Sequence, residues 1–481
     1  MAKNDLDIVK YINDPVYGGI PVTRVELELI DTPAFQRLRG LRQLARVNYV
    51  FPGAEHSRYV HSLGVLYIMG LMTEHLLKKD MLNENDVLKM RVAALLHDIG
   101  HYPLSHLGEG AYSYFKENNI ADSIIHNESD TPQETPLYEL ASSYSKKAHH
   151  EHLGKYVVMN NSAIKNILEK YNLDPEEIGQ IFTGEYGSRN MVYTQLLHSS
   201  LDADRLDYLL RDSYQTGVKY GLVDLQYLVR LLMVQSDKDG HNKMLVCNKK
   251  GQHVVEHFLM SRYFHYSQVI FHKTNGAFEG LIKSLYIKLL QNKRFMYNSL
   301  EEIQDGVNSD EFINFNDSFL EIAMEKMYKE TDDKEYKQLY KMYRHRVRPK
   351  IVFEKKALYD DSPEPDFSVL KWELSKKPEK ITEILKTDKW GYQIVPIEIE
   401  KIHSRYTLTE SVSDHEEELR EAVKLYDQDS EKISYLAEDK LSIINKLANF
   451  KSEFARIYIL EEKDDNEYNR MHRELLDLIT S

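Results

Sequence analysis

The sequence predicts a mostly α-helical protein whose C-terminal part is a smaller α+β region. The segment Val87–Leu96 is apolar on almost every side, which is typical of a helix buried in a protein core. A second largely apolar helix is expected from His61 to Leu77. Beyond about residue 340 the pattern changes, and three short stretches are expected to be strands: Val347–Phe353, Tyr392–Ile399 and Arg405–Leu408.

The chain divides into three parts on these patterns. Residues 1–50 begin with a short strand or turn segment, broken at Gly18-Gly19 as in a hairpin, and then become helical. Residues 51–290 are expected to form the helical core. Residues 291–481 form the C-terminal helical and α+β region, in which the acidic stretch Glu410–Glu431 is expected to be a surface helix.

Composition favours a cytoplasmic protein. The 481 residues carry a formal net charge of −14, which argues against nonspecific binding of nucleic acid because such binding needs a basic face. A single cysteine, Cys247, excludes an internal disulfide and favours a reducing compartment. No apolar run approaches the length of about 18 residues that spans a membrane, and no signal peptide is expected. The polar, proline-containing stretch Asn127–Lys147 is predicted to be a loop.

The pair His97-Asp98 stands at the end of the apolar helix that precedes it. Burying an unpaired carboxylate costs several kcal/mol or more, so Asp98 needs a cation or another partner. His61 could add a second imidazole and Asp204 a second carboxylate, and this mixed set suits a transition metal such as Fe, Mn, Co, Ni or Zn. Taken alone, His61 would more often be a hydrogen-bonded core residue and Asp204 one half of a helix ion pair. Their combination favours a metal.

Several strings in their order along the chain carry a resemblance to a known family: Val50-Phe51-Pro52-Gly53-Ala54, His61-Ser62-Leu63-Gly64-Val65, and His97-Asp98-Ile99-Gly100-His101 followed by Ser105-His106. Over residues 8–290 the chain resembles the HD-domain phosphohydrolases, and within them the deoxynucleoside triphosphate triphosphohydrolases. The resemblance implies an HD-domain helical core over 51–290. It also implies hydrolysis of dNTPs, with dGTP among them, to deoxynucleoside and inorganic triphosphate.

The resemblance assigns roles to the polar residues of this core. A divalent transition metal (Mn, Fe, Zn, Ni or Co) would be held by His61, His97, Asp98 and Asp204, and Mg would accompany the triphosphate. His106 would be the general acid, held by Glu109, while His101 and His150 would contact the phosphates. Glu151 would orient its neighbour His150, although His149 and His152 are alternatives to His150. An imidazole suits proton transfer near neutral pH.

Substrate contacts follow from the same resemblance. The predicted substrate-binding residues are Gln43, Leu44, Arg58, Arg205, Tyr208, Asp212 and Arg262. The arginines would bind phosphate oxygens, although any one of them could be a solvated surface charge. Tyr208 would pack against the deoxyribose, and Asp212 would bond its 3′ hydroxyl. Ile270 stands where the family often has a tyrosine.

The resemblance also implies regulation by a nucleotide activator, either GTP, dGTP or another dNTP, and assembly into a homo-oligomer, with a homotetramer as the expected form. The N-terminal segment would supply the allosteric residues Lys10, Asn13, Asp31, Gln36 and Arg39 at a subunit interface. A second activator site would use Val50, Phe51, Lys250 and Arg456, but Tyr227, Asn248 and Val254 depart from the pattern. Asp31-Thr32-Pro33 could instead be only a helix cap.

Two other functions stay open on the sequence. One is a different HD-domain nucleotide phosphohydrolase, either a phosphodiesterase or a monophosphatase. The other is a nucleic-acid-binding or effector-sensing protein in which the metal-type residues are structural.

Overall fold

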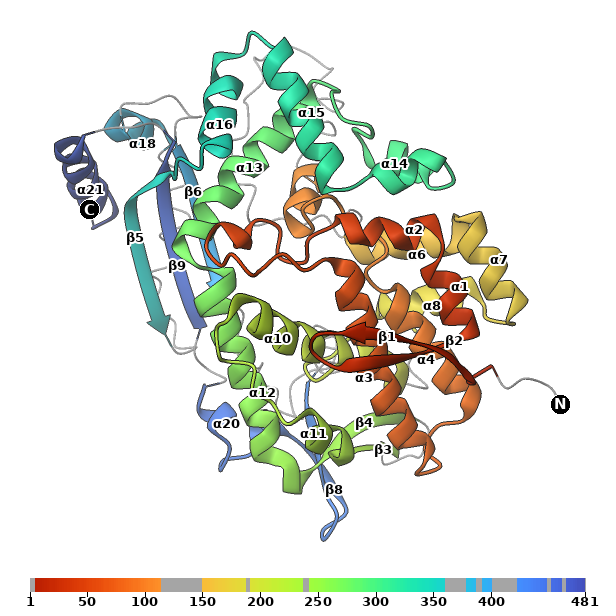
Figure 1. The fold of residues 1–481 in the computed structure, drawn as a ribbon. Coiled ribbons are helices and arrows are strands. Elements are labelled where there is room, and N and C mark those ends of the chain that lie inside the picture. The colour runs from red at the N-terminus through yellow and green to blue at the C-terminus, as the bar shows by residue number, and fades with distance from the viewer. Residues whose placement is uncertain are drawn as a thin grey trace, which may run out of the picture.

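The computed structural model describes residues 5–113, 149–186, 191–236, 242–359, 378–385, 392–399, 422–447, 451–460 and 464–480. It confirms a mostly helical protein with small sheets (Figure 1). The predicted loop Asn127–Lys147 and the predicted strand Arg405–Leu408 lie outside the described residues.

The N-terminal segment starts with the hairpin expected at Gly18-Gly19. Strand β1 (Ile8–Asp14) pairs antiparallel with β2 (Gly18–Thr23), and Gly18 has a φ of +76°, which suits glycine. Helix α1 (Arg24–Ile30) begins with a capping box between Thr23 and Glu26. Thr32 caps the short helix α2 (Pro33–Gln36), which continues into the 3₁₀ turn η1 (Arg37–Gly40).

Three helices form the centre of the molecule. Helix α3 (Arg58–Leu77) packs against both α4 (Glu84–Leu96) and α10 (Ala203–Thr216). Among the described residues, α3 is the one helix long and apolar enough to cross a membrane, but 67% of its most apolar stretch is buried inside the molecule. That burial is what a core helix requires.

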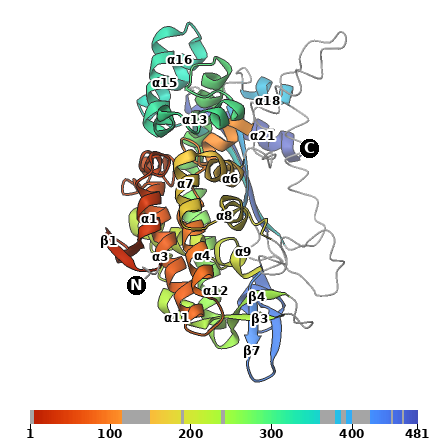
Figure 2. The ribbon, with the colours of Figure 1, turned by 90° about the vertical axis from the view of Figure 1, so that its right-hand side faces the viewer.

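The other helices surround this centre. They are α6 (His150–Asn160), α7 (Ser162–Lys170), α8 (Pro175–Phe182), α9 (Met191–Leu197), α11 (Leu225–Leu231), α12 (Gln252–His265), α13 (Lys273–Gln291), α14 (Leu300–Gly306), α15 (Asp317–Glu330) and α16 (Lys334–Arg344). A π-helical turn (Tyr266–Ile270) continues α12. Helices α13, α15 and α16 pack together at one end of the molecule (Figure 2).

Two sheets complete the fold. One has the order β3-β4-β7-β8, formed by β3 (Leu232–Ser236), β4 (Lys243–Asn248), β7 (Lys424–Asp427) and β8 (Lys432–Tyr435). The other has the order β5-β9-β6, formed by β5 (Lys350–Tyr359), β9 (Lys451–Ile459) and β6 (Tyr392–Ile399). The remaining helices are α18 (Pro378–Leu385), α20 (Ile443–Leu447) and α21 (Asp465–Thr480).

The first sheet corrects two predictions. Residues 232–236 lie within the expected helical core of 51–290 but form β3, and residues 424–427 fall in the expected acidic helix but form β7. The reason is tertiary. Strand β7 pairs in parallel with β4, and Lys424 and Leu425 are buried there.

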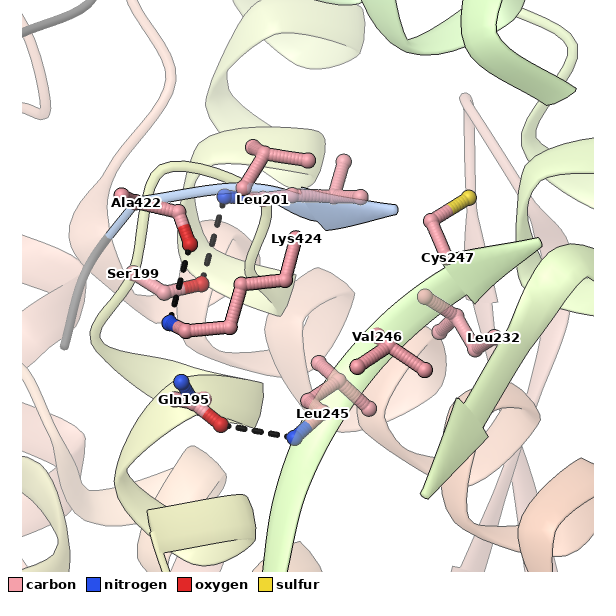
Figure 3. Close-up of a pocket in the computed structure, with 10 residues that line it drawn as sticks. Gln195, Ser199, Leu201, Leu232, Leu245, Val246, Cys247, Ala422 and Lys424 are labelled. Carbon is pink, nitrogen blue, oxygen red and sulfur yellow. Dashed lines mark hydrogen bonds between the residues drawn. The ribbon is translucent and has the colours of Figure 1, made fainter. Parts of the chain in front are cut away.

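A small cavity lies where β4 and β7 meet the segment between α9 and α10 (Figure 3). Apolar side chains from β3, from β4 and from the two residues before β7 form most of its wall, together with Gln195 and Ser199. The ammonium of Lys424 is buried in it and donates to the carbonyl of Ala422 at 3.2 Å. Burial lowers the pKa of Lys424 to about 8.

Candidate metal and phosphate site

The four predicted metal ligands lie together where three helices meet. His61 comes from the first turn of α3, His97 and Asp98 directly follow α4, and Asp204 is in the first turn of α10. The Nε2 atom of His61 is 2.9 Å from Asp204 Oδ1 and 3.6 Å from Asp98 Oδ2. The Nε2 atom of His97 is 3.4 Å from Asp98 Oδ1 and 3.6 Å from Asp204 Oδ1.

The imidazoles are oriented as metal ligands are. Each ring engages its Nδ1 elsewhere, since His61 Nδ1 is 2.7 Å from Asp207 Oδ2 and His97 Nδ1 is 2.8 Å from the Ala94 carbonyl. Among the described residues, the buried Nε2 atoms of both rings make no hydrogen bond, although both face the carboxylates of Asp98 and Asp204. Buried polar atoms without a partner are rare in folded proteins, and a fixed Nδ1 with a free Nε2 is the usual arrangement of a metal-bound histidine. The cluster therefore fits a divalent metal.

A network behind His61 fixes its ring. Asp207 accepts from Arg211 through Nε at 2.8 Å and Nη2 at 3.0 Å, and Arg211 Nη1 reaches Asp14 of β1 at 2.7 Å. Gly64 of α3 permits this approach, because a Cβ there would stand 1.9 Å from Asp207 Oδ1. The hairpin thus helps to orient a metal-type histidine.

The charges of the cluster call for a cation. Burial would raise the pKa of Asp98, but Arg58, His97 and His101 hold it well below its usual range. Burial would lower the pKa of His61, but Asp204 and Asp207 raise it to about 10. The carboxylates of Asp98 and Asp204 around the two imidazoles favour a positive charge at the centre of the cluster.

A second group of histidines adjoins the first through Asp98. His101 Nε2 lies 3.1 Å from Asp98 Oδ1, and the ring of His101 stacks on that of His150 at 3.7 Å. The ring of His106 stands edge-on to both, at 5.1 Å from each. Three imidazoles beside a metal-type cluster form a surface suited to phosphate oxygens.

Glu109 holds two of these histidines. Its Oε2 atom is 3.1 Å from His106 Nδ1 and 3.2 Å from His150 Nδ1. Burial would raise the pKa of Glu109, but the hydrogen bonds with His106 and His150 lower it far below its usual value. The side chain of His106 is 61% exposed, so its outer nitrogen can reach a ligand.

The predicted role of Glu151 is corrected. Its carboxylate lies 3.4 Å from His149 Nδ1 and 3.5 Å from His198 Nδ1, while the hydrogen bond of His150 goes to Glu109. The side chain of Glu151 in the first turn of α6 points toward His198, just after α9, so sequence adjacency gave the wrong partner.

The predicted phosphate-binding arginines differ in their surroundings. Arg58 is buried and donates to Asp98 Oδ2 at 2.7 Å and to Ser105 Oγ at 2.8 Å. Arg205 donates to Asp202 and to the Ser199 carbonyl. Arg262 lies 5.7 Å from the ring centre of Tyr266. Burial raises the pKa of Tyr208 well above its usual value. The positive charges of Arg262 and Arg205 oppose this rise, so both arginines lie close to Tyr208.

Two histidines that the sequence did not single out surround Asp212. His56 Nε2 is 2.7 Å from Asp212 Oδ1 and His265 Nε2 is 2.9 Å from Asp212 Oδ2, and both rings are buried. Tyr208 stacks obliquely on His265 at 5.3 Å. The Nδ1 atoms of both histidines and the buried Gln43 Oε1 make no hydrogen bond to any described residue. Leu44 is half-buried.

The predicted N-terminal nucleotide residues lie at or near the surface. Lys10 and Asn13 are exposed on β1, and Asp31 is exposed at the end of α1. Arg39 donates to Gln36 Oε1 at 2.7 Å and stands 3.6 Å over the ring of Tyr59. Thr32, not Asp31, is the N-cap of α2.

The second predicted activator set is spread over three segments. Val50 and Phe51 are half-buried, and Phe51 lies 5.8 Å from the ring of His272. Arg456 of β9 donates to the neighbouring Phe271 carbonyl at 2.8 Å. Lys250 is exposed in the turn before α12.

Comparison with known proteins identifies the core. Residues 58–210 match the model of the HD domain. The chain is 31% identical over 281 residues to the uncharacterized protein YwfO of Bacillus subtilis, covering 57% of this chain and 55% of that protein. It is 27% identical over 307 residues to the human deoxynucleoside triphosphate triphosphohydrolase SAMHD1, covering 59% of this chain and 45% of that protein. The chain spans about half the length of the curated relatives it matches first.

A solved structure shares the fold over nearly the whole chain. The crystal structure of a phosphohydrolase from Bacteroides thetaiotaomicron superposes with a TM-score of 0.63 at 23% identity, covering 93% of this chain and 99% of that one. Residues 58–210 therefore contain an HD domain, and the fold around it is shared with that structure. The four residues of the metal-type cluster, His61, His97, Asp98 and Asp204, all lie inside the matched segment.

Proposed function

We propose that this protein is a metal-dependent phosphohydrolase that converts dNTPs to deoxynucleoside and inorganic triphosphate. The observation that carries the proposal is the contact between a metal-type cluster and a histidine trio, made where His101 meets Asp98. The first group suits a divalent cation and the second suits a chain of phosphates. The likeness to human SAMHD1 supports dNTPs as the substrate class.

Each residue of the site has a task in this proposal. His61, His97, Asp98 and Asp204 would hold a divalent metal, of which Mn, Fe, Zn, Ni and Co suit the mixed nitrogen and oxygen donors. A bound metal would polarise a phosphoryl oxygen and lower the pKa of bound water. The phosphates, with Mg bound to them, would be held by two histidines and three arginines: His101, His150, Arg58, Arg205 and Arg262.

His106 is the general acid in this proposal. Its Nδ1 is held by Glu109, and its exposed Nε2 can give a proton to the departing 5′ oxygen. Tyr208 and Asp212 would bind the deoxyribose, with Gln43 and Leu44 beside them. The two histidines that hold Asp212 would keep its carboxylate in place for the sugar hydroxyl.

The test is a chromatographic assay of each dNTP, alone and in pairs, with Mn or Mg present. We expect a deoxynucleoside and intact inorganic triphosphate. Release of orthophosphate or of a nucleoside monophosphate would replace the proposal with the other phosphohydrolase activities. No turnover together with retardation of an oligonucleotide would favour a binding protein.

A ligand variant sharpens this assay. Asp98→Asn removes one charged ligand and should abolish turnover and lower the bound metal measured by elemental analysis. The matched control is Asp80→Asn, because Asp80 is exposed after α3 and its left-handed backbone accepts asparagine. Full metal and full activity in Asp98→Asn would refute the assignment of the centre.

A further inference from the structure

The loop that carries His101 and His106 has little regular structure of its own. Between Ile99 and Ser105 the backbone forms turns, and the next helix starts at His106. Leu104 and Ser105 have φ values of +60° and +56°, a left-handed conformation that residues with a side chain rarely adopt. Two such residues in sequence persist only where the surroundings hold them. The positions of His101 and His106, called the phosphate histidines below, therefore depend on contacts from outside the loop.

Arg37 supplies these contacts from the N-terminal segment. Its guanidinium donates from Nη2 to the Ile99 carbonyl at 2.6 Å and from Nη1 to the His101 carbonyl at 2.9 Å. Nη1 also donates to the Phe315 carbonyl at 3.0 Å, just before α15. Arg37 is 1% exposed and is one of the largest fully buried side chains. Burial lowers the pKa of Arg37 to about 9, although Asp317 opposes this.

This environment is unusual for a purely structural arginine. A buried ion is commonly paired with a carboxylate, and apolar residues of similar volume often stabilise a core at least as well. Within the part of the chain that the structure describes, the three hydrogen-bond acceptors of Arg37 are backbone carbonyls, and two of them belong to the His101 loop. The planar fork of a guanidinium fixes several carbonyls at set angles, which an apolar side chain cannot do.

Asp317 of α15 holds the same loop through its carboxylate. Its Oδ1 accepts from the amide of Leu104 at 2.7 Å and its Oδ2 accepts from the amide of Arg42 at 3.1 Å. Ser105 Oγ donates to the Arg42 carbonyl at 2.8 Å. The loop is thus fixed by a cation at its carbonyls and by an anion at its strained turn.

We propose that Arg37 is a positioning residue that sets the distance between the phosphate histidines and the metal-type cluster. The contact that it controls is the 3.1 Å approach of His101 Nε2 to Asp98 Oδ1. Arg37 touches none of the four metal-type residues through a hydrogen bond or ion pair of the described residues. It therefore acts on phosphate binding and on the chemical step, not on the metal. The inference rests on the proposed function of the site.

The test compares Arg37→Lys with Arg91→Lys. Arg91 is also buried and also donates through its guanidinium, but to Glu26, away from the loop. Lysine keeps the charge and loses the fork, so Arg37→Lys should retain the metal. Its kcat should fall by about 10- to 100-fold, the scale of a misplacement near 1 Å. Arg91→Lys should lose a similar amount of thermal stability and keep kcat within about twofold, since it acts only on stability.

A binding measurement tests the positioning role of Arg37 separately from the proposed function of the site. Calorimetric titration of the Mn-loaded protein with inorganic triphosphate should give about 10-fold weaker binding in Arg37→Lys, with unchanged affinity for Mn. Asp317→Asn provides a second variant if Arg37→Lys does not fold, and it should weaken triphosphate binding in the same direction. Wild-type protein that binds no triphosphate would refute the proposed function. If wild-type protein binds triphosphate and both Arg37→Lys and Asp317→Asn bind it equally well, the positioning role alone is refuted.

Discussion

Glu109 is the residue that organises proton transfer in the proposed site, because it holds His106 and His150 with one oxygen. If His106 is the acid, His106→Ala should keep the metal and bind inorganic triphosphate almost as wild type does. Its chemical step should slow by about 10²- to 10⁴-fold, the usual loss for a missing general acid. His253→Ala is the matched control, because His253 is an exposed histidine on α12 whose Nδ1 also lies 3.1 Å from a glutamate oxygen, Glu256 Oε2. Single-turnover kinetics measure the step, and an unchanged rate in His106→Ala would move the acid role to another residue.

At the residue scale, the order of the motifs predicted which side chains gather in the metal-type cluster, whereas adjacency predicted the wrong partner for Glu151. The motifs around His61, His97 and Asp204 are far apart in the chain, yet the structure brings their side chains together. Glu151 stands beside His150 in the sequence but turns toward His149 and His198. The direction of a side chain depends on the helix face and its neighbours, which a short string does not specify.

The same limit applies to partners outside any motif. His56 and His265 meet at Asp212 from two distant segments, and neither histidine lies in a pattern that predicts this contact. Asp207 offered a signal, because it lies three residues after Asp204 and so near it on the helix surface. Its role behind His61 still required the position of α3.

At the element scale, Lys424 of β7 gives a stability prediction. The pKa of its buried ammonium is about 8 in the folded protein, whereas an unfolded lysine titrates near about 10.4. Below the folded pKa both states are protonated, and burial of the charge disfavours folding. As the pH rises from about 8 to about 10.4 the folded state loses its proton first, so the free energy of unfolding increases over that window.

Lys424→Met should therefore stabilise the protein at pH 7, by about 1–3 kcal/mol in urea unfolding. The gain over wild type should shrink by about 1 kcal/mol at pH 9, because wild-type Lys424 is then largely neutral when folded. Lys440→Met is the control, since Lys440 is exposed nearby and its replacement should change stability by less than about 0.5 kcal/mol. A destabilised Lys424→Met with the same pH dependence as wild type would contradict the argument.

The helices were more predictable than the strands. Helices α3 and α4 carry long apolar patterns whose cause is local, so their positions follow from the sequence. Strand β7 lies in an acidic stretch and forms because β4 pairs with it across about 180 residues of chain, which is a non-local contact. The strands β5 and β6 were expected near their observed places, since β-branched and aromatic residues gather there.

At the scale of the whole molecule, the N-terminal segment is joined to the site by two buried arginines. Arg37 of this segment holds the His101 loop, and Arg211 of α10 links Asp14 of the hairpin to Asp207 behind His61. The surface of the same segment carries Asp31, Gln36 and Arg39, the residues predicted to bind a nucleotide activator. A ligand on that surface would thus lie next to side chains that set the geometry of the site.

We therefore expect dNTP hydrolysis to rise when GTP, dGTP or dTTP is added, together with a shift toward a larger homo-oligomer, for which a tetramer is the expected size. A nucleotide that binds only the assembled form favours assembly by mass action, and typical coupling between sites is about 5- to 150-fold. Asp31→Ala with Arg39→Ala should abolish the stimulation and keep the bound metal. The exposed pair Glu74→Ala with Lys78→Ala on α3 is the control and should be stimulated normally. Light scattering and turnover, measured with one dNTP and then with each activator, decide the matter. A constant mass with additive rates for every mixture would mean that this surface has no regulatory role.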